Sequence, residues 1–443
     1  MLNAKRDVIA AIATASGRGG VGIVRISGSN LSAYAQKISS INPIPRHAHF
    51  VKFTDEFGST LDEGVLLYFK APYSFTGEDV IELQGHGGPV VLNMLLARCL
   101  QLGARMADPG EFTLRAYLNE KLDLAQAESV ADLIDASSEQ AVRSAVRSLS
   151  GEFSKQIALL VAELIDLRML VEATLDFPEE ELDFLQAAKA FERLANIQLQ
   201  VTKVEQSAKQ GSLLRDGIRV VLIGQPNVGK SSLLNQFTGE DVAIVSAVAG
   251  TTRDTVRETI QIEGVPIHII DTAGLRDTND EVEAIGIQRT WSAIQQANIA
   301  LLLVDAKHGV TDAEKNIIEA LPKKLPLYTV HNKIDLAQPE KIPGDFYVSA
   351  KLGTGITELK QLLLSVAGWQ TETSSVFLAR ARHLDALRLA KQCLNNAMEV
   401  QSQALELLAE DLRLAQHFLA SITGEFSADD LLGEIFSRFC IGK

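Results

Sequence analysis

One stretch of the sequence has the residue types and the spacing of a phosphate-binding loop. "VVLIGQPNVGKSSLL" contains the pattern G-x-x-x-x-G-K-S from Gly224 to Ser231, after an apolar run and before a helix-like segment. Glycines allow backbone N–H groups to turn inward around phosphates. In such a loop Lys230 reaches the β- and γ-phosphates, and the Ser231 hydroxyl binds Mg²⁺. The pattern therefore predicts a nucleoside triphosphate site, although this motif alone also occurs as a chance turn.

Two further motifs supply groups for the metal ion and the γ-phosphate. "AGTTRD" offers Thr252 as a second Mg²⁺ ligand. "DTAG" follows the strand-like run "IHII", and its Asp271 is suited to hold Mg²⁺ through water. The Gly274 N–H is placed to sense the γ-phosphate. Both motifs come after the phosphate-binding pattern, in the order that a nucleotide hydrolase requires.

The last two motifs select the base. "NKID" follows "PLYTVH", and its Asp335 is suited to accept from both N–H groups of guanine, which adenine does not offer in the same way. "SAK" then closes over the base. Each motif alone resembles a loop turn, but all five in order predict binding and hydrolysis of GTP. The residues expected at the nucleotide from these motifs are Asn227, Val228, Gly229, Lys230, Ser231, Ser232, Ala249, Gly250, Thr251, Thr252, Asp271, Thr272, Ala273, Gly274, Asn332, Lys333, Asp335, Ser349, Ala350 and Lys351.

Two positions depart from the pattern of many small GTPases. Leu275 follows "DTAG", where many of them have a glutamine that orients the attacking water. Another residue must place that water, and the nearby acids are Asp277, Asp280, Glu281 and Glu283. The phosphate loop also contains Asn227, which is either a solvent-facing turn residue or a ligand for a cation beside the phosphates. A monovalent cation there would neutralise charge between the β- and γ-phosphates, as an arginine finger does.

The elements around these motifs divide the chain into four predicted segments. Residues 1–118 are mixed α/β, with strand-like runs such as "DVIAAIAT", "GVGIVRISG", "GVLLYFK" and "DVIELQG" and a helix "VVLNMLLARCLQLG". Residues 119–216 and 370–443 are helical, and 217–369 alternate short apolar strands with helices, which is typical of a parallel α/β sheet. We expect an α/β domain inserted into one helical domain. The alternative is two unrelated helical domains.

Composition fits a globular protein of about three domains on a prior of ~150 residues each. The 443 residues are 46% hydrophobic and 22% charged, and the net charge of −14 argues against a broad basic surface for nucleic acid, while a local basic patch stays possible. Three widely spaced cysteines predict neither a disulfide framework nor a metal cluster, which fits a reducing cytoplasm. The N-terminal run, slightly like a signal peptide, is expected to be a buried strand, and no run approaches the ~18 apolar residues of a membrane span.

Two other features have competing interpretations. "GRGGVG" spells a dinucleotide-binding pattern, but a strand follows it and no acid lies some 20 residues on, so we interpret it as a glycine turn. The ending "SRFCIGK" lacks the residues of a prenylation signal. Upstream, a helix with capping-box-like Ser427 and Asp430 presents an apolar face. That face consists of Leu431, Leu432, Ile435, Phe436 and Phe439.

The whole chain resembles the MnmE family of tRNA-modification GTPases, also called TrmE. The markers are "GRGGVGIVRISG", "SFTGEDVIELQGHGG", "PGEFTLRAYLNEKLDLAQAE", "GQPNVGKSSLLN", "AGTTRD" and "CIGK". The resemblance implies a cytoplasmic homodimer with an N-terminal formyl-tetrahydrofolate-binding domain and a G domain inserted in a helical domain. It implies an FAD-containing partner, MnmG (GidA), in a heterotetramer or larger complex. Together they would add an aminomethyl or carboxymethylaminomethyl group to the wobble uridine of certain tRNAs.

The resemblance also assigns residues. It implies K⁺-promoted G-domain dimerisation and hydrolysis, with K⁺ held by Asn227, Ser246, Val248 and Thr251, and it adds Ser246, Ala247 and Val248 to the nucleotide contacts. The catalytic residues would be Glu283, Lys230 and Asn227, with Glu283 positioning water in place of the missing glutamine. 5-Formyltetrahydrofolate, or a related one-carbon folate, would contact Arg25, Glu82, Lys121 and Lys443. Without the resemblance, these four would be taken as surface salt bridges.

The terminal segment is expected to close the folate site. Gly442 allows a tight turn, Lys443 would meet a ligand carboxylate, and Cys440 is either near the one-carbon group or a packed, inert thiol. Two other function classes compete with the leading one. A ribosomal-RNA-binding assembly GTPase usually has a basic appendage, which this acidic chain lacks. A membrane-remodelling GTPase would need a basic amphipathic segment, and none stands out.

Overall fold

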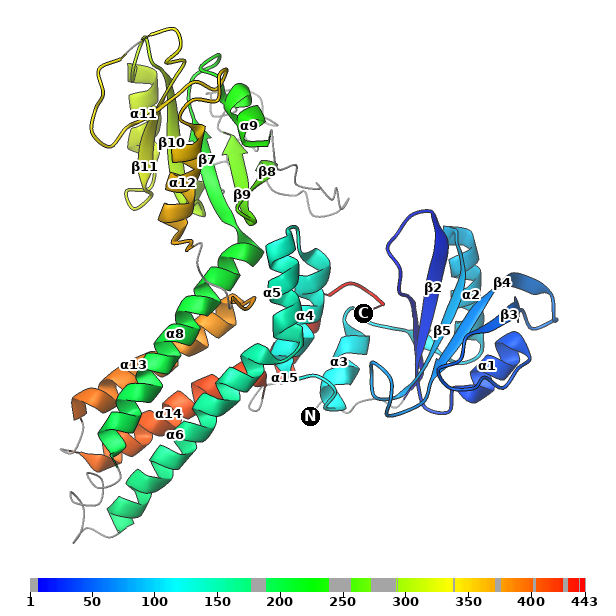
Figure 1. Cartoon of the computed structure of the whole chain (residues 1–443). Helices are drawn as coiled ribbons and strands as arrows, with labels where there is room; N and C mark the ends of the chain where they lie inside the picture. The colour runs from blue at the N-terminus through cyan, green and yellow to red at the C-terminus, as the bar shows by residue number, and fades with distance from the viewer. Residues whose placement is uncertain are drawn as a thin grey trace. The chain divides into compact units, whose positions relative to one another are not determined.

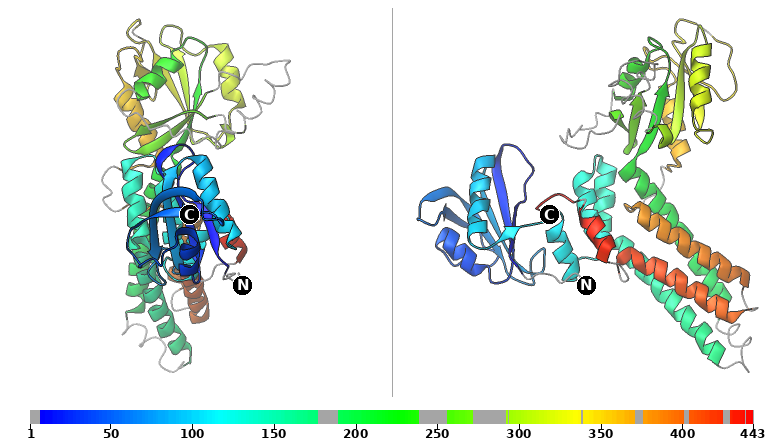
Figure 2. Two further views of the ribbon diagram at one scale, coloured as in Figure 1. Left: turned by 90° about the vertical axis from the view of Figure 1, so that its right-hand side faces the viewer. Right: turned by 180° about the vertical axis from the view of Figure 1, so that it is seen from behind.

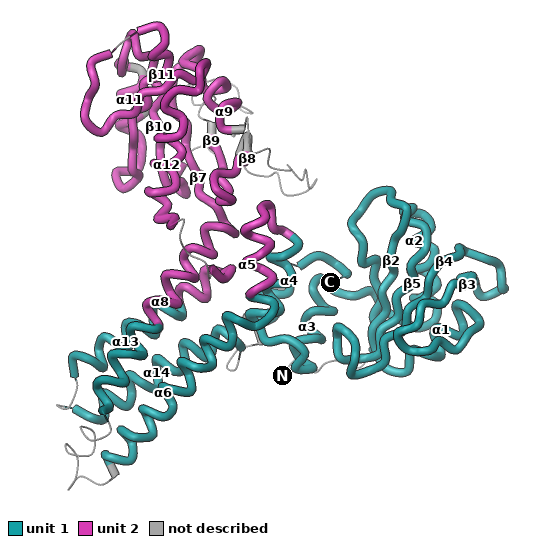
Figure 3. Tube along the Cα trace, in the orientation of Figure 1, with its two compact units in different colours: residues 1–134, 148–200, 386–443 teal, residues 135–147, 201–385 magenta. Residues whose placement is uncertain are grey.

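A computed structural model describes residues 7–176, 189–238, 256–271, 292, 294–337, 339–370, 376–400, 404–424, 429–437 and 439–442. The chain divides into two compact units (Figure 3). Unit 1 contains Met1–Ile134, Ser148–Gln200 and Ala386–Lys443, and unit 2 contains Asp135–Arg147 and Val201–Asp385. These units group residues by contact and do not follow the four predicted segments, whose boundaries therefore stay a prediction.

Unit 1 begins with a six-stranded sheet in the order β3-β4-β5-β2-β1-β6, of which Figure 1 labels β2, β3, β4 and β5. Its strands are β1 (Ile9–Ile12), β2 (Gly19–Gly28), β3 (His49–Thr54), β4 (Thr60–Phe69), β5 (Asp79–Gly87) and β6 (Arg105–Met106). Its helices are α1 (Ser32–Ser39), α2 (Pro89–Gln101) and α3 (Glu111–Leu118). All pairs are antiparallel except β1 with β6. The predicted strand runs are confirmed, and the predicted helix corresponds to α2.

Alternation along the strands creates two faces of this sheet. Val24 and Ile26 on β2 are fully buried in the main core together with α1 and α2. Arg25 and Ser27 alternate with them and therefore point to the opposite face. At the β1 edge that face is covered by α3, whose Phe112 packs with Ile9, Ala11 and Ala107. Arg25 is thus carried by a rigid strand beside a packed helix.

The remaining helices are divided between the two units. α4 (Leu124–Asp135), α5 (Glu139–Leu149), α6 (Glu152–Asp176) and α8 (Ala190–Asp216) precede the second sheet in the chain, and α13 (Ala381–Val400), α14 (Leu405–Thr423) and α15 (Asp429–Ser437) follow it. Most of α5 belongs to unit 2, and α8 and α13 each run from one unit into the other. α6 and α14 run side by side (Figures 1 and 2), and Arg168 Nη1 of α6 donates to Gln416 of α14 at 2.6 Å. Among the described helices, none has a stretch long and apolar enough to cross a bilayer.

Unit 2 contains a second six-stranded sheet, in the order β12-β11-β10-β7-β9-β8. Its strands are β7 (Ile218–Ile223), β8 (Val256–Ile262), β9 (Val265–Asp271), β10 (Ile299–Asp305), β11 (Leu327–Asn332) and β12 (Phe346–Val348). Its helices are α9 (Lys230–Thr238), α11 (Asp312–Ala320) and α12 (Ile356–Ala367). The prediction of a parallel sheet is confirmed for the four predicted strands β7, β9, β10 and β11. β8 was not predicted and adds an antiparallel edge strand, which pairs with β9 across the tight turn at Glu263 and Gly264.

A crossing inside unit 2 ties the start of the second sheet to the segment that follows α12. The Gln210 amide of α8 donates to Gly368 O at 2.6 Å and accepts from Gln370 N at 2.9 Å. Gly211 follows Gln210, and the chain at Phe377 passes very close to it. A Cβ added to Gly211 would lie 1.5 Å from the Phe377 carbonyl oxygen. Only glycine allows this approach, so the chain leaves and re-enters the helices at one fixed point.

Candidate functional site

The phosphate-binding pattern forms a loop between β7 and the first residue of α9. Its two glycines are required by their surroundings. A Cβ at Gly224 would lie 2.5 Å from the Leu303 carbonyl oxygen, and one at Gly229, whose φ is +100°, would lie 2.3 Å from Asn332 Nδ2. The loop is therefore pressed against β10 and β11, at the carboxyl ends of parallel strands. Ligands of open α/β sheets bind at this edge.

The loop also brings its polar groups to the start of a helix. Lys230 is the first residue of α9, and its ammonium donates to Gly224 O at 2.9 Å. Ser231 is exposed in the first turn. Asn227 is exposed with a left-handed φ of +64°. A helix N-terminus with a glycine loop in front of it offers unpaired N–H groups and a positive dipole end to an anion.

Asn332 connects this loop to the two motifs predicted to select the base. Its side chain is buried, and its Nδ2 donates to Val228 O at 2.8 Å. Its Oδ1 accepts from Ala350 N at 2.9 Å. One amide thus holds the phosphate loop, "NKID" and "SAK" together, so these three predicted motifs lie next to one another.

The neighbouring residues of "NKID" are held by further polar contacts. Asp335 accepts from the Ser349 hydroxyl at 2.6 Å, and its carboxylate is exposed. Lys333, with a left-handed φ of +67°, donates to Asp305 at 2.8 Å. The Lys333 hydrogen bond holds the pKa of the Asp305 carboxyl below its usual value. The exposed Asp335 carboxylate is in a position to accept from the edge of a base.

Several predicted contacts lie outside the described residues. These are Ser246, Ala247, Val248, Ala249, Gly250, Thr251, Thr252, Thr272, Ala273, Gly274, Glu283 and Lys443. Asp271 is described only as backbone, at the end of β9 and opposite Leu222 of β7, just before the phosphate loop. Within the described ranges, no group of three or more His, Cys, Asp or Glu side chains is placed to hold a metal ion. The predicted Mg²⁺ and K⁺ ligand sets stay predictions.

In unit 1, two of the four residues predicted for folate form a pair. Arg25 on β2 lies directly opposite Glu82 on β5, and its Nε and Nη2 both donate to Glu82 Oε1, at 3.0 and 2.9 Å. The guanidinium carbon lies 5.9 Å from the Phe75 ring centroid and 5.8 Å from that of Phe112. Lys121 is not part of this pair and donates to Pro72 O at 3.2 Å, in the same loop that carries Phe75.

The C-terminal segment reaches this pair. Leu432, Ile435, Phe436 and Phe439 are buried against α4, which confirms the predicted apolar face for these four residues, whereas Ser427 and the Leu431 side chain lie outside the described residues. Gly442 has a φ of +99°, and its carbonyl oxygen lies 3.5 Å from Arg25 Nη1. A Cβ on Gly442 would lie 2.4 Å from Ile12 O. Cys440 is exposed.

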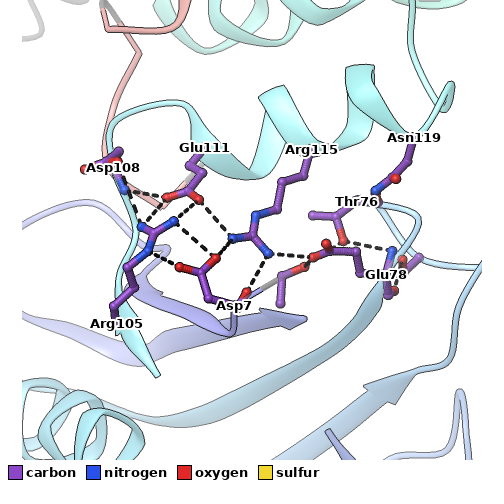
Figure 4. A network of polar contacts seen from close by, with 10 residues as sticks. Asp7, Thr76, Glu78, Arg105, Asp108, Glu111, Arg115 and Asn119 are labelled. Atoms are coloured by element: carbon purple, nitrogen blue, oxygen red, sulfur yellow. Dashed lines mark hydrogen bonds and ion pairs between the residues drawn. The ribbon is translucent and has the colours of Figure 1, made fainter. Parts of the chain in front are cut away.

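Sequence reasoning missed a network of charges beneath this site (Figure 4). Arg115 of α3 is buried and donates to Asp7, Glu78 and Glu111 at 2.9–3.0 Å. Arg105 of β6 donates to Asp7 at 2.6 Å and to Glu111 at 2.5 and 2.8 Å. Arg105, Glu111 and Arg115 lie in or near the marker "PGEFTLRAYLNEKLDLAQAE", but nothing in the sequence alone pairs them with Asp7 and Glu78.

Burial acts against the charged carboxylates of this network. It would raise the pKa of Asp7 and of Glu111, but the hydrogen bonds and charges of the two arginines outweigh it. The pKa of both carboxyls is therefore lowered. The network fixes the start of β1, β6 and α3, and through Glu78 it also fixes the loop that carries Phe75.

The second sheet is mainly parallel and carries a glycine loop at the N-terminus of a helix. Next to that loop lies an exposed aspartate that can bind a base. These features define a P-loop GTPase. Family models match almost the whole chain: residues 8–121 match the "GTP-binding protein TrmE N-terminus" and residues 124–440 the "MnmE helical domain". The chain belongs to the MnmE (TrmE) family of tRNA modification GTPases.

Full-length relatives agree. The tRNA modification GTPase MnmE of Nitrosomonas europaea is 60% identical over 447 residues, which cover 99% of each chain. That of Thiobacillus denitrificans is 61% identical over 439 residues, covering 99% of this chain and 98% of the relative. The solved structure of Aquifex aeolicus Era bound to GDP and aluminium fluoride is 25% identical and covers 40% of this chain and 66% of that one, with a TM-score of 0.28. At that score, the fold assignment depends on the strand order described above.

Proposed function

We propose that this chain is a potassium-dependent GTPase that works with an FAD-dependent partner on the wobble uridine of certain tRNAs. The pair adds an aminomethyl or carboxymethylaminomethyl group, and a tetrahydrofolate supplies the one-carbon unit. Family membership makes GTP hydrolysis in tRNA modification the activity of the chain. The observation that carries the GTP part is the Asn332 side chain, which joins the phosphate loop to the guanine motifs.

The phosphate loop supports the GTP step with groups of its own. The Lys230 ammonium, now on Gly224 O, moves a short distance to bind the β- and γ-phosphates, where negative charge develops during hydrolysis. The exposed Ser231 hydroxyl is the kind of hard oxygen ligand that suits Mg²⁺. Bound Mg²⁺ would neutralise charge on the two terminal phosphates. Asp335 would select guanine through its two N–H groups.

Two positions in the sequence support the proposed potassium dependence. Leu275 has no polar atom to orient water, so Glu283 is proposed to do so through a bridging water. Asn227 is exposed at the rim of the phosphate loop, so its amide oxygen is accessible to a cation beside the phosphates. The remaining K⁺ ligands would be Ser246, Val248 and Thr251. Potassium would supply the positive charge that an arginine finger supplies elsewhere.

The Arg25–Glu82 pair supports folate as the one-carbon carrier. A pterin presents adjacent N–H groups, and Glu82 Oε2 accepts only a long contact from Gln84, at 3.4 Å. Arg25 orients Glu82 by donating two hydrogen bonds to its other oxygen, Oε1. Phe75 and Phe112 flank the pair with aromatic surface. Lys121 and Lys443 would meet the carboxylates of the glutamate tail.

The GTP part is tested by hydrolysis rates in K⁺ and in Na⁺. We expect K⁺ to stimulate the wild type strongly, and Asn227→Ala to lose this stimulation while retaining GTP affinity. Asn93→Ala, an exposed asparagine of α2, is the matched control and should behave like wild type. Equal rates in the two salts would refute potassium dependence. A Glu283→Ala variant should lose turnover far more than affinity, because water placement matters in the transition state.

The folate and tRNA parts need a second experiment. Purified protein is assayed for bound formyl-folate, and tRNA modification is reconstituted with the FAD-containing partner. Deletion of residues 440–443 should abolish modification and weaken folate binding, while GTP hydrolysis in the G domain persists. Normal modification and unchanged folate affinity in the deletion variant would remove the C-terminal segment from the site.

A further inference from the structure

An exposed aromatic residue in unit 1 has an arginine guanidinium against its ring. Tyr73 is 69% exposed, and the Arg46 guanidinium carbon lies 5.5 Å from its ring centroid. Arg46 Nη2 also donates to Tyr73 O at 3.3 Å, and the Tyr73 amide donates to Lys70 O at 2.9 Å. We name these three residues the Tyr73 patch. It combines an exposed ring, a planar cation beside that ring, and the exposed residue Lys70, whose carbonyl oxygen accepts from the Tyr73 amide.

The charge of the Tyr73 patch contrasts with that of the chain. The chain has 56 acidic and 42 basic residues, yet no Asp or Glu occurs from Val8 to Thr54, and none occurs at 64–77. The patch is built from these two acid-free segments. Among the ion pairs of the described residues, none involves Arg46 or Lys70. A locally positive, aromatic surface on an acidic protein favours an anionic partner that also carries flat rings.

The loop that carries Tyr73 is fixed at several points. Ala71 N donates to Asp79 Oδ1 at 3.0 Å, and the Ser74 hydroxyl donates to Glu78 O at 2.5 Å. Asn119 donates to Thr76 O at 2.7 Å, and Glu78 belongs to the charge network of Figure 4. Tyr73 is therefore presented on a rigid support, so a ligand that stacks on it pays little ordering entropy.

The same loop links the patch to the candidate folate site. Phe75, two residues from Tyr73, lies against Arg25, so the loop has one aromatic residue at the Arg25–Glu82 pair and another in the patch. Arg46 has a left-handed φ of +61°, a strained conformation for a non-glycine residue. Such strain concentrates at functional positions. A molecule held on the patch would therefore be held next to the one-carbon chemistry.

We propose that the Tyr73 patch binds a single-stranded segment of the RNA substrate. One base stacks on Tyr73, and the flanking phosphates contact Arg46 and Lys70. Single-stranded RNA is recognised by stacking on aromatic rings combined with cations along the backbone, which is the composition of this patch. The proposal rests on tRNA being the substrate, as proposed above, and it adds where this chain touches it.

The test measures binding of an anticodon stem–loop RNA to the full-length chain by fluorescence anisotropy. Tyr73→Ala should weaken binding about tenfold, because stacking contributes about 1–3 kcal/mol per base. Tyr73→Phe should bind like wild type, since its ring still stacks. The double variant Arg46→Ala/Lys70→Ala should reduce the slope of log K against log salt by about 1.4, or about 0.7 for each lost phosphate contact.

The control is Phe57→Ala, which removes an 85% exposed aromatic residue beside Asp55 and Glu56 in the same unit. It should leave RNA binding unchanged, and all variants should hydrolyse GTP like wild type. Equal RNA affinity of Tyr73→Ala and Phe57→Ala, or no RNA binding by the wild type, overturns the proposal. The proposal is also overturned if Tyr73→Ala binds RNA like the wild type and loses only affinity for a folate polyglutamate. If the wild type modifies tRNA while the patch variants bind RNA normally, only the patch is refuted and the proposed function stands.

Discussion

Replacing Arg115 by leucine removes the cation at the centre of the charge network in unit 1. The side chain is 5% exposed and donates to Asp7, Glu78 and Glu111. Leucine fills much of the space but leaves these carboxylates with less positive charge. Arg105 still compensates Asp7 and Glu111, whereas Glu78 keeps only the Ser27 hydroxyl, at 2.8 Å.

The free-energy cost depends on how far water can solvate the carboxylates that lose Arg115. Removing one partner of a buried ion pair typically costs 3–5 kcal/mol. Asp7 is about one-third exposed, so water will solvate part of its released charge, and we expect the lower end of that range, about 3 kcal/mol. Arg115→Lys keeps the charge but loses the fork that reaches three carboxylates at once, so its loss should lie in between.

Hydrogen exchange of the β1, β6 and α3 amides is the right assay, because it reports the opening free energy of this region in a chain with several domains. Lys52→Met is the control, since Lys52 forms an exposed pair with Glu63 in the same sheet and should cost less than about 1 kcal/mol. If Arg115→Leu changed protection no more than Lys52→Met, the network would be a surface feature and the reasoning above would be wrong.

Three further predictions concern other contacts. Asn332→Ala leaves Val228 O and Ala350 N without their partner and should reduce GTP affinity at least tenfold in a nucleotide titration; unchanged affinity would contradict its role as a connector. The pKa values of Asp7 and Glu111 are lowered in the folded chain, so both carboxylates stabilise it fully at pH above their unfolded pKa values near 4. This stability is lost as the pH falls through the folded pKa values. The thermal unfolding temperature of the wild type should therefore fall in acid, and Arg115→Leu should reduce that fall. Gly442→Val should expose the Ile12 region to exchange and reduce folate retention, whereas Gly433→Ala, with nothing within 4 Å of the added atom, should do neither.

Elements with strong local signals could be predicted from the sequence. The central strands β7 and β10 are mainly apolar and almost entirely buried, and the phosphate loop follows from the G-x-x-x-x-G-K-S pattern between a strand and a helix. β3, β6, β8 and β12 were not among the predicted strands. All four are edge strands, and β6 and β12 have only two and three residues, so their places depend on pairing with neighbouring strands rather than on composition.

The candidate site shows the same difference between features with a local sequence signal and features that depend on long-range contacts. Lys230 and Asp335 could be assigned from their motifs, because each motif is local and carries its own backbone geometry. The structural role of Asn332 could not, because it joins segments that are more than 100 residues apart in the chain. The Arg115 network and the Tyr73 patch depend on residues from distant strands and loops in the same way. Long-range contacts of this kind are decided by packing, which a single sequence does not reveal.

The Gln210 crossing has a consequence for the order of folding. Arg168 of α6 and Gln416 of α14 are in contact, and they close a loop of 248 residues. Within that loop, Gln210 and Gly368 are also in contact, and they are 158 residues apart. If the inserted domain folds first, the helices need to close an effective loop of only about 90 residues, which lowers the closure cost by about 0.9 kcal/mol. The folded nucleotide-binding domain would then hold two distant points of the chain together and make the pairing of α6 with α14 about four to five times more probable. A chain whose inserted domain is slow to fold should assemble its helices late, and the crossing at Gly211 is where that delay would begin.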